Sequence, residues 1–160
     1  MTTAVPQFPQ QWGNDNAIVI GFGHGIANSS LHALGGVATL VNGGSLVRHT
    51  FTKPNNSEQH RHVISAATSE RQRYLLKAHV DYGSAKVAQI PGLPLGALTG
   101  VNEKIFGGHY LAGRVQTSFV ATFTIKGPQY VVMLQFDEPN RITITLETSI
   151  YAPILPLRAL

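Results

Sequence analysis

The side chains most able to act together chemically are basic residues that alternate along positions 71–81. Read with the two-residue period of a β-strand, these positions place one set of side chains on each face. The first face is cationic and the second nearly all apolar, so such a strand could cover a core and bind a polyanion. An ordinary solvated face is the alternative interpretation. The cationic face carries Arg71, Arg73, Lys77 and His79, with Leu75 and Asp81.

This basic stretch belongs to a longer segment, 60–82, which we expect to form two strands. Thr68-Ser69-Glu70 would be the polar turn between them. Residues 48–77 carry six lysines and arginines, and Glu58 and Glu70 are the only acids among them. The excess favours an anionic partner.

His60 and His62 alternate around Arg61, which is the spacing of a two-histidine metal pair. A zinc site needs three or more ligands, and only His49 or His79 could add one. Surface histidines beside arginine are the simpler interpretation, so we predict no metal and no cofactor. The eight carboxylates are scattered, no GxSxG or P-loop motif is present, and the chain has no cysteine. We therefore predict that the chain is not an enzyme.

The composition indicates a single domain over residues 1–160 with a hydrophobic core. Charged residues make up only 12% of the chain, so we expect surface to be hidden by self-association. The net charge of +4 agrees with a weakly anion-binding protein. No apolar run approaches the length of a membrane span, and no membrane partner is predicted.

Most of the chain is predicted to be β-structure, with a hairpin turn at Asn42-Gly43-Gly44. Gly21 to Gly25 after a strand suggests a nucleotide fingerprint, but the spacing is wrong. Residues 137–151 begin with the signals of a helix start and then alternate with the period of a strand. We favour the strand. Residues 83–113 have no clear period and would be a long loop, with or without a short hairpin. The expected strands are 17–22, 36–41, 45–53, 114–125 and 130–136.

Three segments together resemble the coat proteins of single-stranded RNA bacteriophages of the levivirus type. ATSERQRYLLKAHV is similar to the family's basic strand after a serine-rich turn. RVQTSFVATFTI is similar to the strand that follows the family's long glycine-containing loop. DEPNRITITLETSIYAPILPL stands where the family has an acidic helix start and two C-terminal helices.

The resemblance implies an α+β fold, with an antiparallel sheet of about six or seven strands and C-terminal helices packed on a dimer partner. Residues 1–35 would be an N-terminal extension or hairpin, 83–113 an assembly loop and 137–160 a dimerisation segment. The chain would be a capsid subunit that forms homodimers, then an icosahedral shell, in the virion of a bacteriophage. Its partners would be further copies of itself and single-stranded RNA.

The same resemblance places RNA on the inner face of the sheet. Arg73 and Lys77 match the family's basic RNA-facing positions, Phe119 matches an aromatic that stacks on a base, and Arg61 and Ser65 match inward positions. Arg71 and His79 join this group through their positive charge. The predicted RNA-binding residues are Arg61, Ser65, Arg71, Arg73, Lys77, His79 and Phe119.

Two other interpretations stay open at this point. An all-β sandwich or jelly roll would suit another viral capsid, tail or decoration subunit. A small β-barrel that binds a ligand through its histidines is the other alternative.

Overall fold

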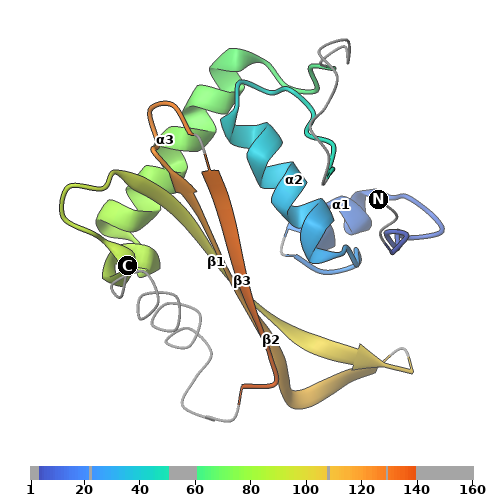
Figure 1. Cartoon of the computed structure of the whole chain (residues 1–160). Coiled ribbons are helices and arrows are strands. Elements are labelled where there is room, and N and C mark those ends of the chain that lie inside the picture. The colour runs from blue at the N-terminus through green and yellow to red at the C-terminus, as the bar shows by residue number, and fades with distance from the viewer. Residues whose placement is uncertain (1–3, 22, 51–60, 108, 129, 140–160) are drawn as a thin grey trace.

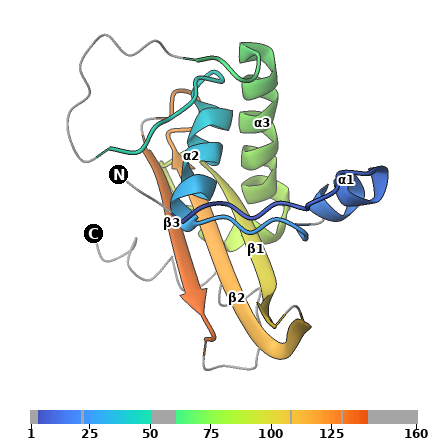
Figure 2. The ribbon, with the colours of Figure 1, turned by 90° about the vertical axis from the view of Figure 1, so that its right-hand side faces the viewer.

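The computed structural model describes residues 4–21, 23–50, 61–107, 109–128 and 130–139. Three α-helices and a short 3-10 helix precede a three-stranded antiparallel sheet. Figure 1 shows the sheet as a long twisted ribbon, with α2 and α3 beside one end of it, and Figure 2 shows the same arrangement from the side. No helix in the described part of the chain is long and apolar enough to cross a membrane.

The first two helices occupy segments that we predicted to be strands. Helix α1 spans Asn14–Gly21 and α2 spans Ser30–Val41. The apolar runs 17–22 and 36–41 are short enough to suit either structure, and their ends decide between them. Ser29 caps α2 by accepting a hydrogen bond from the backbone of His32, a signal that favours a helix start. The strand predictions for 17–22 and 36–41 are therefore wrong.

Helix α3, Ala66–Tyr82, contradicts the two strands predicted for 60–82. Ser65 is its N-cap and accepts a hydrogen bond from the backbone N–H of Thr68 at 3.1 Å. The segment predicted as a turn, 68–70, lies inside the first turns of the helix. Ser69, Leu76 and Val80 are its buried residues, and their spacing of seven and four is that of a helix face.

Ser69 and Arg73 fasten α3 to the C-terminal end of α2. The Ser69 hydroxyl donates to the carbonyl of Leu40 at 2.7 Å and accepts from the backbone N–H of Gly43 at 3.0 Å. Arg73 Nη1 donates to Ser69 Oγ at 3.2 Å and to the carbonyl of Val41 at 2.9 Å. One donor and two acceptor positions are all that a serine hydroxyl has, so this junction is fully satisfied.

The sheet has the order β1-β2-β3, with strands Leu95–Phe106, His109–Phe123 and Tyr130–Asp137. The strands predicted at 114–125 and 130–136 are confirmed. Strand β1 and the 3-10 helix η1, Ser84–Ala88, both lie in the stretch 83–113 that was predicted as a loop. The hairpin allowed for in that stretch exists. Its second strand is β2, which runs beyond residue 113 to Phe123.

Two hydrophobic clusters hold the helices to the sheet. The register pairs Ala97 with Ala121 and Leu95 with Phe123, so these side chains share one face of the sheet. That face packs against Val80 of α3 and against η1. The second cluster joins α2 and α3 to the β2–β3 hairpin. The first cluster contains Val80, Ala85, Ala88, Leu95, Ala97, Phe119 and Ala121, and the second Val41, Leu76 and Ile125.

The predicted sheet of six or seven strands is not what the described residues form. Residues 140–160, which include most of the predicted dimerisation segment and of the ambiguous stretch 137–151, lie outside the described part. Residues 51–53 of the predicted strand 45–53 and the loop after it also lie outside the described part. The described residues 45–50 form no strand, only an isolated bridge from Ser45 to His62, so that prediction is wrong there. The division of the chain into an extension, an assembly loop and a dimerisation segment stays a prediction.

Candidate functional site

A chain of polar side chains joins the C-terminal end of α3 to the middle of β1. His79 Nδ1 lies 3.0 Å from the carbonyl oxygen of Ala97, and His79 Nε2 lies 2.8 Å from the hydroxyl of Ser84. The Ser84 hydroxyl in turn lies 3.5 Å from that of Thr99. Thr99 is partly buried and Ser84 is exposed, so the end of this chain is open to a ligand.

Strand β1 brings three consecutive residues, Leu98, Thr99 and Gly100, to this place. Thr99 shares a face with Ala97, and Leu98 points to the other face because side chains alternate along a strand. A Cβ atom at Gly100 would lie 2.9 Å from Ser118 Oγ, so the close approach of β1 to β2 favours glycine there. The side chain of Leu98 is 40% exposed.

β1 is an edge strand of the described sheet. The backbone N–H and C=O groups along the outer side of an edge strand can pair with an extended peptide. The polar chain from Thr99 to His79 and this edge together form the candidate site.

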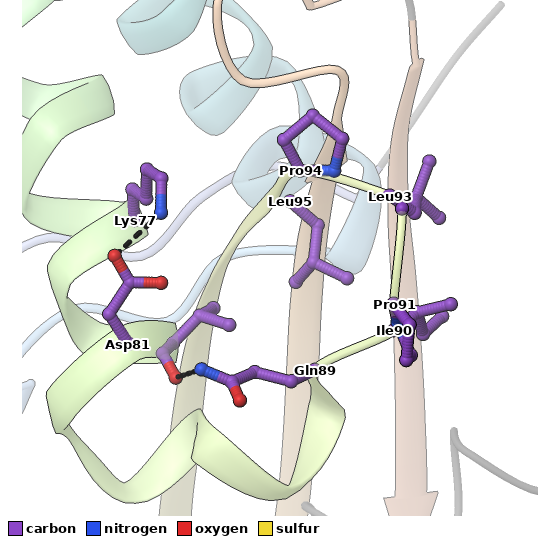
Figure 3. Close-up of a pocket in the computed structure, with 10 residues that line it drawn as sticks. Lys77, Asp81, Gln89, Ile90, Pro91, Leu93, Pro94 and Leu95 are labelled. Atoms are coloured by element: carbon purple, nitrogen blue, oxygen red, sulfur yellow. Dashed lines mark hydrogen bonds and ion pairs between the residues drawn. The ribbon is translucent and has the colours of Figure 1, made fainter.

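A groove of about 580 Å³ lies next to the site, between α3 and the residues that lead into β1. Figure 3 shows Lys77 and Asp81 on its helical side, joined at 2.6 Å, and the run from Ile90 to Leu95 facing them. Leu93 donates its N–H to the carbonyl of Ile90 across a turn with Pro91 and Gly92 at its centre. Gly92 has φ +80°, as the third residue of a type II turn requires.

The residues that line the groove support the position of β1, and their polar side chains already have partners among the same residues. The ion pair that lines it is satisfied within one helix turn, and Gln89 Nε2 donates to the carbonyl of Val80 at 3.1 Å. The hydrogen bond of Gln89 holds the start of the 89–95 segment against α3. The segment in turn fixes where β1 begins, and therefore where Thr99 lies.

The seven residues predicted to bind RNA do not share one surface. Ser65 caps α3, Arg73 is bonded to the end of α2, and Phe119 is 2% exposed in the core. Lys77 is paired with Asp81. The remaining three have other positions: Arg61 and Arg71 are exposed, and His79 contacts Ser84 and the Ala97 carbonyl. A helix places Arg71 and Arg73 about 200° apart, so the cationic strand face does not exist.

Histidines, too, are dispersed. His62 Nε2 lies 3.5 Å from the Ser45 hydroxyl, far along the chain from His79 in α3. Among the described residues, three or more His, Asp or Glu side chains do not come together in a group that could hold a metal ion.

A family model described as the penicillin-binding protein transpeptidase domain matches residues 4–156 of the chain. The probable peptidoglycan D,D-transpeptidase FtsI of Caulobacter vibrioides is 34% identical over 149 residues, covering 86% of this chain and 25% of the relative. The stage V sporulation protein D of Bacillus subtilis is 29% identical over 146 residues, 84% of this chain and 22% of that protein. The chain thus spans about a quarter of the length of these relatives.

Solved structures agree on the fold. The transpeptidase domain of Burkholderia pseudomallei penicillin-binding protein 3 superposes with a TM-score of 0.78 at 23% identity, over 94% of this chain and 48% of that domain. Penicillin-binding protein 3 of Mycobacterium tuberculosis gives a TM-score of 0.71 at 20% identity, over 97% of this chain and 41% of the other. The described α+β arrangement is therefore a part of the penicillin-binding fold.

These matches overturn the identity suggested by the sequence. The coat-protein resemblance is wrong, as are the coat-protein fold with its dimer-packed helices, the sandwich alternative and the other two functional alternatives. The predictions of a capsid role, of partners in a shell and in RNA, and of a location in the virion are also wrong. The prediction that the chain is not an enzyme is contradicted as well, because the named relatives are peptidoglycan D,D-transpeptidases.

The family has a motif that the sequence analysis missed. Penicillin-binding proteins carry Ser-x-x-Lys, with a nucleophilic serine, together with Ser-Asp-Asn and Lys-Thr-Gly. Thr-Gly occurs once in this sequence, as Thr99-Gly100, and Leu98 precedes it. A search for Thr-Gly in a β-strand next to a helix would have found this signal, whereas a search for the complete Lys-Thr-Gly motif would not.

Proposed function

The chain belongs to the penicillin-binding protein transpeptidase family, and we propose that it forms the part of a peptidoglycan D,D-transpeptidase domain that bears the x-Thr-Gly strand of the substrate cleft. The observation that supports this best is the position of Leu98-Thr99-Gly100 on edge strand β1, beside polar groups from α3 and η1. The family match covers this strand and every element that supports it.

The substrate of such a reaction is a peptide, and an edge strand suits a peptide. An extended stem peptide laid along β1 would exchange backbone hydrogen bonds with it, and its side chains would alternate toward and away from the body of the domain. The Thr99 hydroxyl, 3.5 Å from Ser84, would then turn its hydrogen from Ser84 to a carbonyl or carboxylate oxygen of the bound peptide.

His79 has a positioning role in this proposal. Its ring bridges the Ala97 carbonyl and the Ser84 hydroxyl, and therefore ties β1 to the chain just after α3. A ring nitrogen that donates to the carbonyl leaves the other nitrogen to accept from Ser84, which orients the serine toward Thr99.

No serine in these 160 residues is followed three positions later by lysine, so an acylation test must supply the Ser-x-x-Lys segment. We would replace the matched segment of the Caulobacter relative with residues 4–156 and introduce Leu98→Lys to complete the Lys-Thr-Gly motif. Labelling with a fluorescent penicillin is the assay, and the unaltered relative is the positive control. The proposal expects a labelled band that unlabelled penicillin competes away. A chimera that melts cooperatively but takes no label would refute it.

A further inference from the structure

We propose that Leu98 determines the ligand specificity of this cleft, by removing positive charge from the strand so that it no longer favours ligands with a free carboxylate. The proposal rests on the proposed function, because it concerns the same strand. Penicillins and peptides that end in D-Ala-D-Ala both bear a carboxylate, and a lysine ammonium is its natural counter-ion. Leucine cannot take that role.

The other two residues of the motif are kept for reasons of local structure. The Thr99 hydroxyl lies 3.5 Å from that of Ser84, and a Cβ atom at Gly100 would lie 2.9 Å from Ser118 Oγ, so the serine side chain would have to move. Position 98 has no such constraint, because its side chain is 40% exposed. The leucine is therefore not needed as a core residue, and a lysine there would be tolerated.

The apolar character extends beyond this one residue. Val101, three positions on, is 38% exposed on the same strand. Val101 shares the face of Thr99 and Leu98 lies on the opposite face, so each face of the strand carries one exposed, uncharged aliphatic side chain near Thr99.

Three of the cations near the site in the chain have other partners, and a fourth, Lys86 of η1, is exposed. Lys77 pairs with Asp81 at 2.6 Å, and Arg73 donates to the Val41 carbonyl and to Ser69. Lys104, further along β1, pairs with Asp137 and Glu138, both at 2.9 Å. These contacts hold the charges of Lys77, Arg73 and Lys104 away from position 98, and the strand itself has no cation from Leu95 to Glu103. On β1, the polar chain through Thr99 therefore binds a ligand by neutral hydrogen bonds. Such bonds do not distinguish strongly between a carboxylate and an amide.

The direct test compares two peptides on the 160-residue chain: acetyl-D-Ala-D-Ala with a free carboxylate and the same peptide as its C-terminal amide. Backbone amide shifts of Thr99 and Gly100 report binding. We expect the wild-type chain to show less than a threefold preference for the acid. Leu98→Lys should prefer the acid about 10- to 100-fold, the range of a charge-assisted hydrogen bond. Leu98→Met, which has a similar length without charge, should behave like the wild type. A wild-type preference as large as that of Leu98→Lys would overturn the proposal.

The chimeras of the preceding section provide the second measurement, which decides the matter if the isolated chain binds neither peptide. Acylation by penicillin should be at least about tenfold faster in the chimera with Leu98→Lys than in the chimera that keeps Leu98, at equal melting temperature. Equal rates in the two would overturn this inference and leave the proposed function intact. If neither chimera is labelled, the proposed function fails, and this inference with it.

Discussion

Replacing Ser69 with alanine should destabilise the chain far more than the loss of one oxygen atom suggests. Ser69 is fully buried, and its hydroxyl joins the Leu40 carbonyl, the Gly43 N–H and Arg73. In Ser69→Ala the two backbone groups of the α2 end lose a partner. Each buried polar group left unsatisfied costs about 1–3 kcal/mol, and alanine returns about 0.5 kcal/mol through its higher helix propensity. We therefore expect a loss of about 1.5–5.5 kcal/mol in the free energy of unfolding.

The assay is urea unfolding followed by far-ultraviolet circular dichroism, with the midpoint falling and the slope unchanged. Glu70→Ala is the matched control, because Glu70 is the next residue of the same helix and is exposed. Its change should stay within about 0.5 kcal/mol. A double mutant with Arg73→Met should be less destabilised than the sum of the single changes, since both act on one junction. If Ser69→Ala lost less than about 0.5 kcal/mol, the junction would not hold α2 to α3 as described.

Three further changes test other parts of the fold. Gly96→Ala would place a Cβ atom 2.8 Å from that of Leu76, and such overpacking should cost about 1–3 kcal/mol in the same urea assay, whereas an unchanged midpoint would mean that the helix can move away. Thr117→Val should stabilise by about 1 kcal/mol, because the Thr117 hydroxyl is buried without a partner among the described residues; destabilisation would indicate a partner there. The hydrogen bonds that Lys104 donates to the carboxylates of Asp137 and Glu138 raise the pKa of Lys104 above 10.5, so its contribution to stability is present below that pH and disappears as the pH rises through the folded value. Lys104→Met should remove this alkaline dependence, and an identical pH profile of melting temperature in both proteins would contradict the assignment.

The later strands could be predicted because their sequence allows little else. Residues 114–125 combine β-branched and aromatic side chains in strict alternation, and 130–136 follow them after a Gly-Pro turn. Both runs form strands in the structure. Local preference and tertiary packing agree there, so the pattern was sufficient.

Helix α3 could not be predicted in the same way, because apolar residues on its exposed face obscure the helical period of its buried side chains. Ser69, Arg73, Leu76 and Val80 form the side that faces α2 and the sheet, but two of these four are polar. Meanwhile Tyr74, Leu75 and Tyr82 are exposed, and the large apolar side chains fall between the buried ones. The basic residues then alternate by chance, which favoured a strand. The Ser65 cap was the better signal.

The candidate site was missed for a different reason. Its strand lies in a glycine-rich stretch, 83–113, where no period is visible, and Leu98 breaks the one motif that would have identified it. The contact of Thr99 with Ser84 depends on how β1 passes the end of α3, which no local pattern encodes. The family match was needed to give the strand its meaning.

The β1–β2 hairpin runs well past the helices, as Figure 1 shows, and its far end exposes about half or more of each of Ile105, Phe106 and Tyr110. Strand β2, with 15 residues, would reach about 50 Å if straight. The two ends of one continuous ladder should therefore exchange their amide hydrogens at very different rates. Amide hydrogens near Ala121 would exchange only through global unfolding, while those near Tyr110 would exchange through local fraying. The hairpin tip can therefore change conformation without disturbing the strand at Thr99.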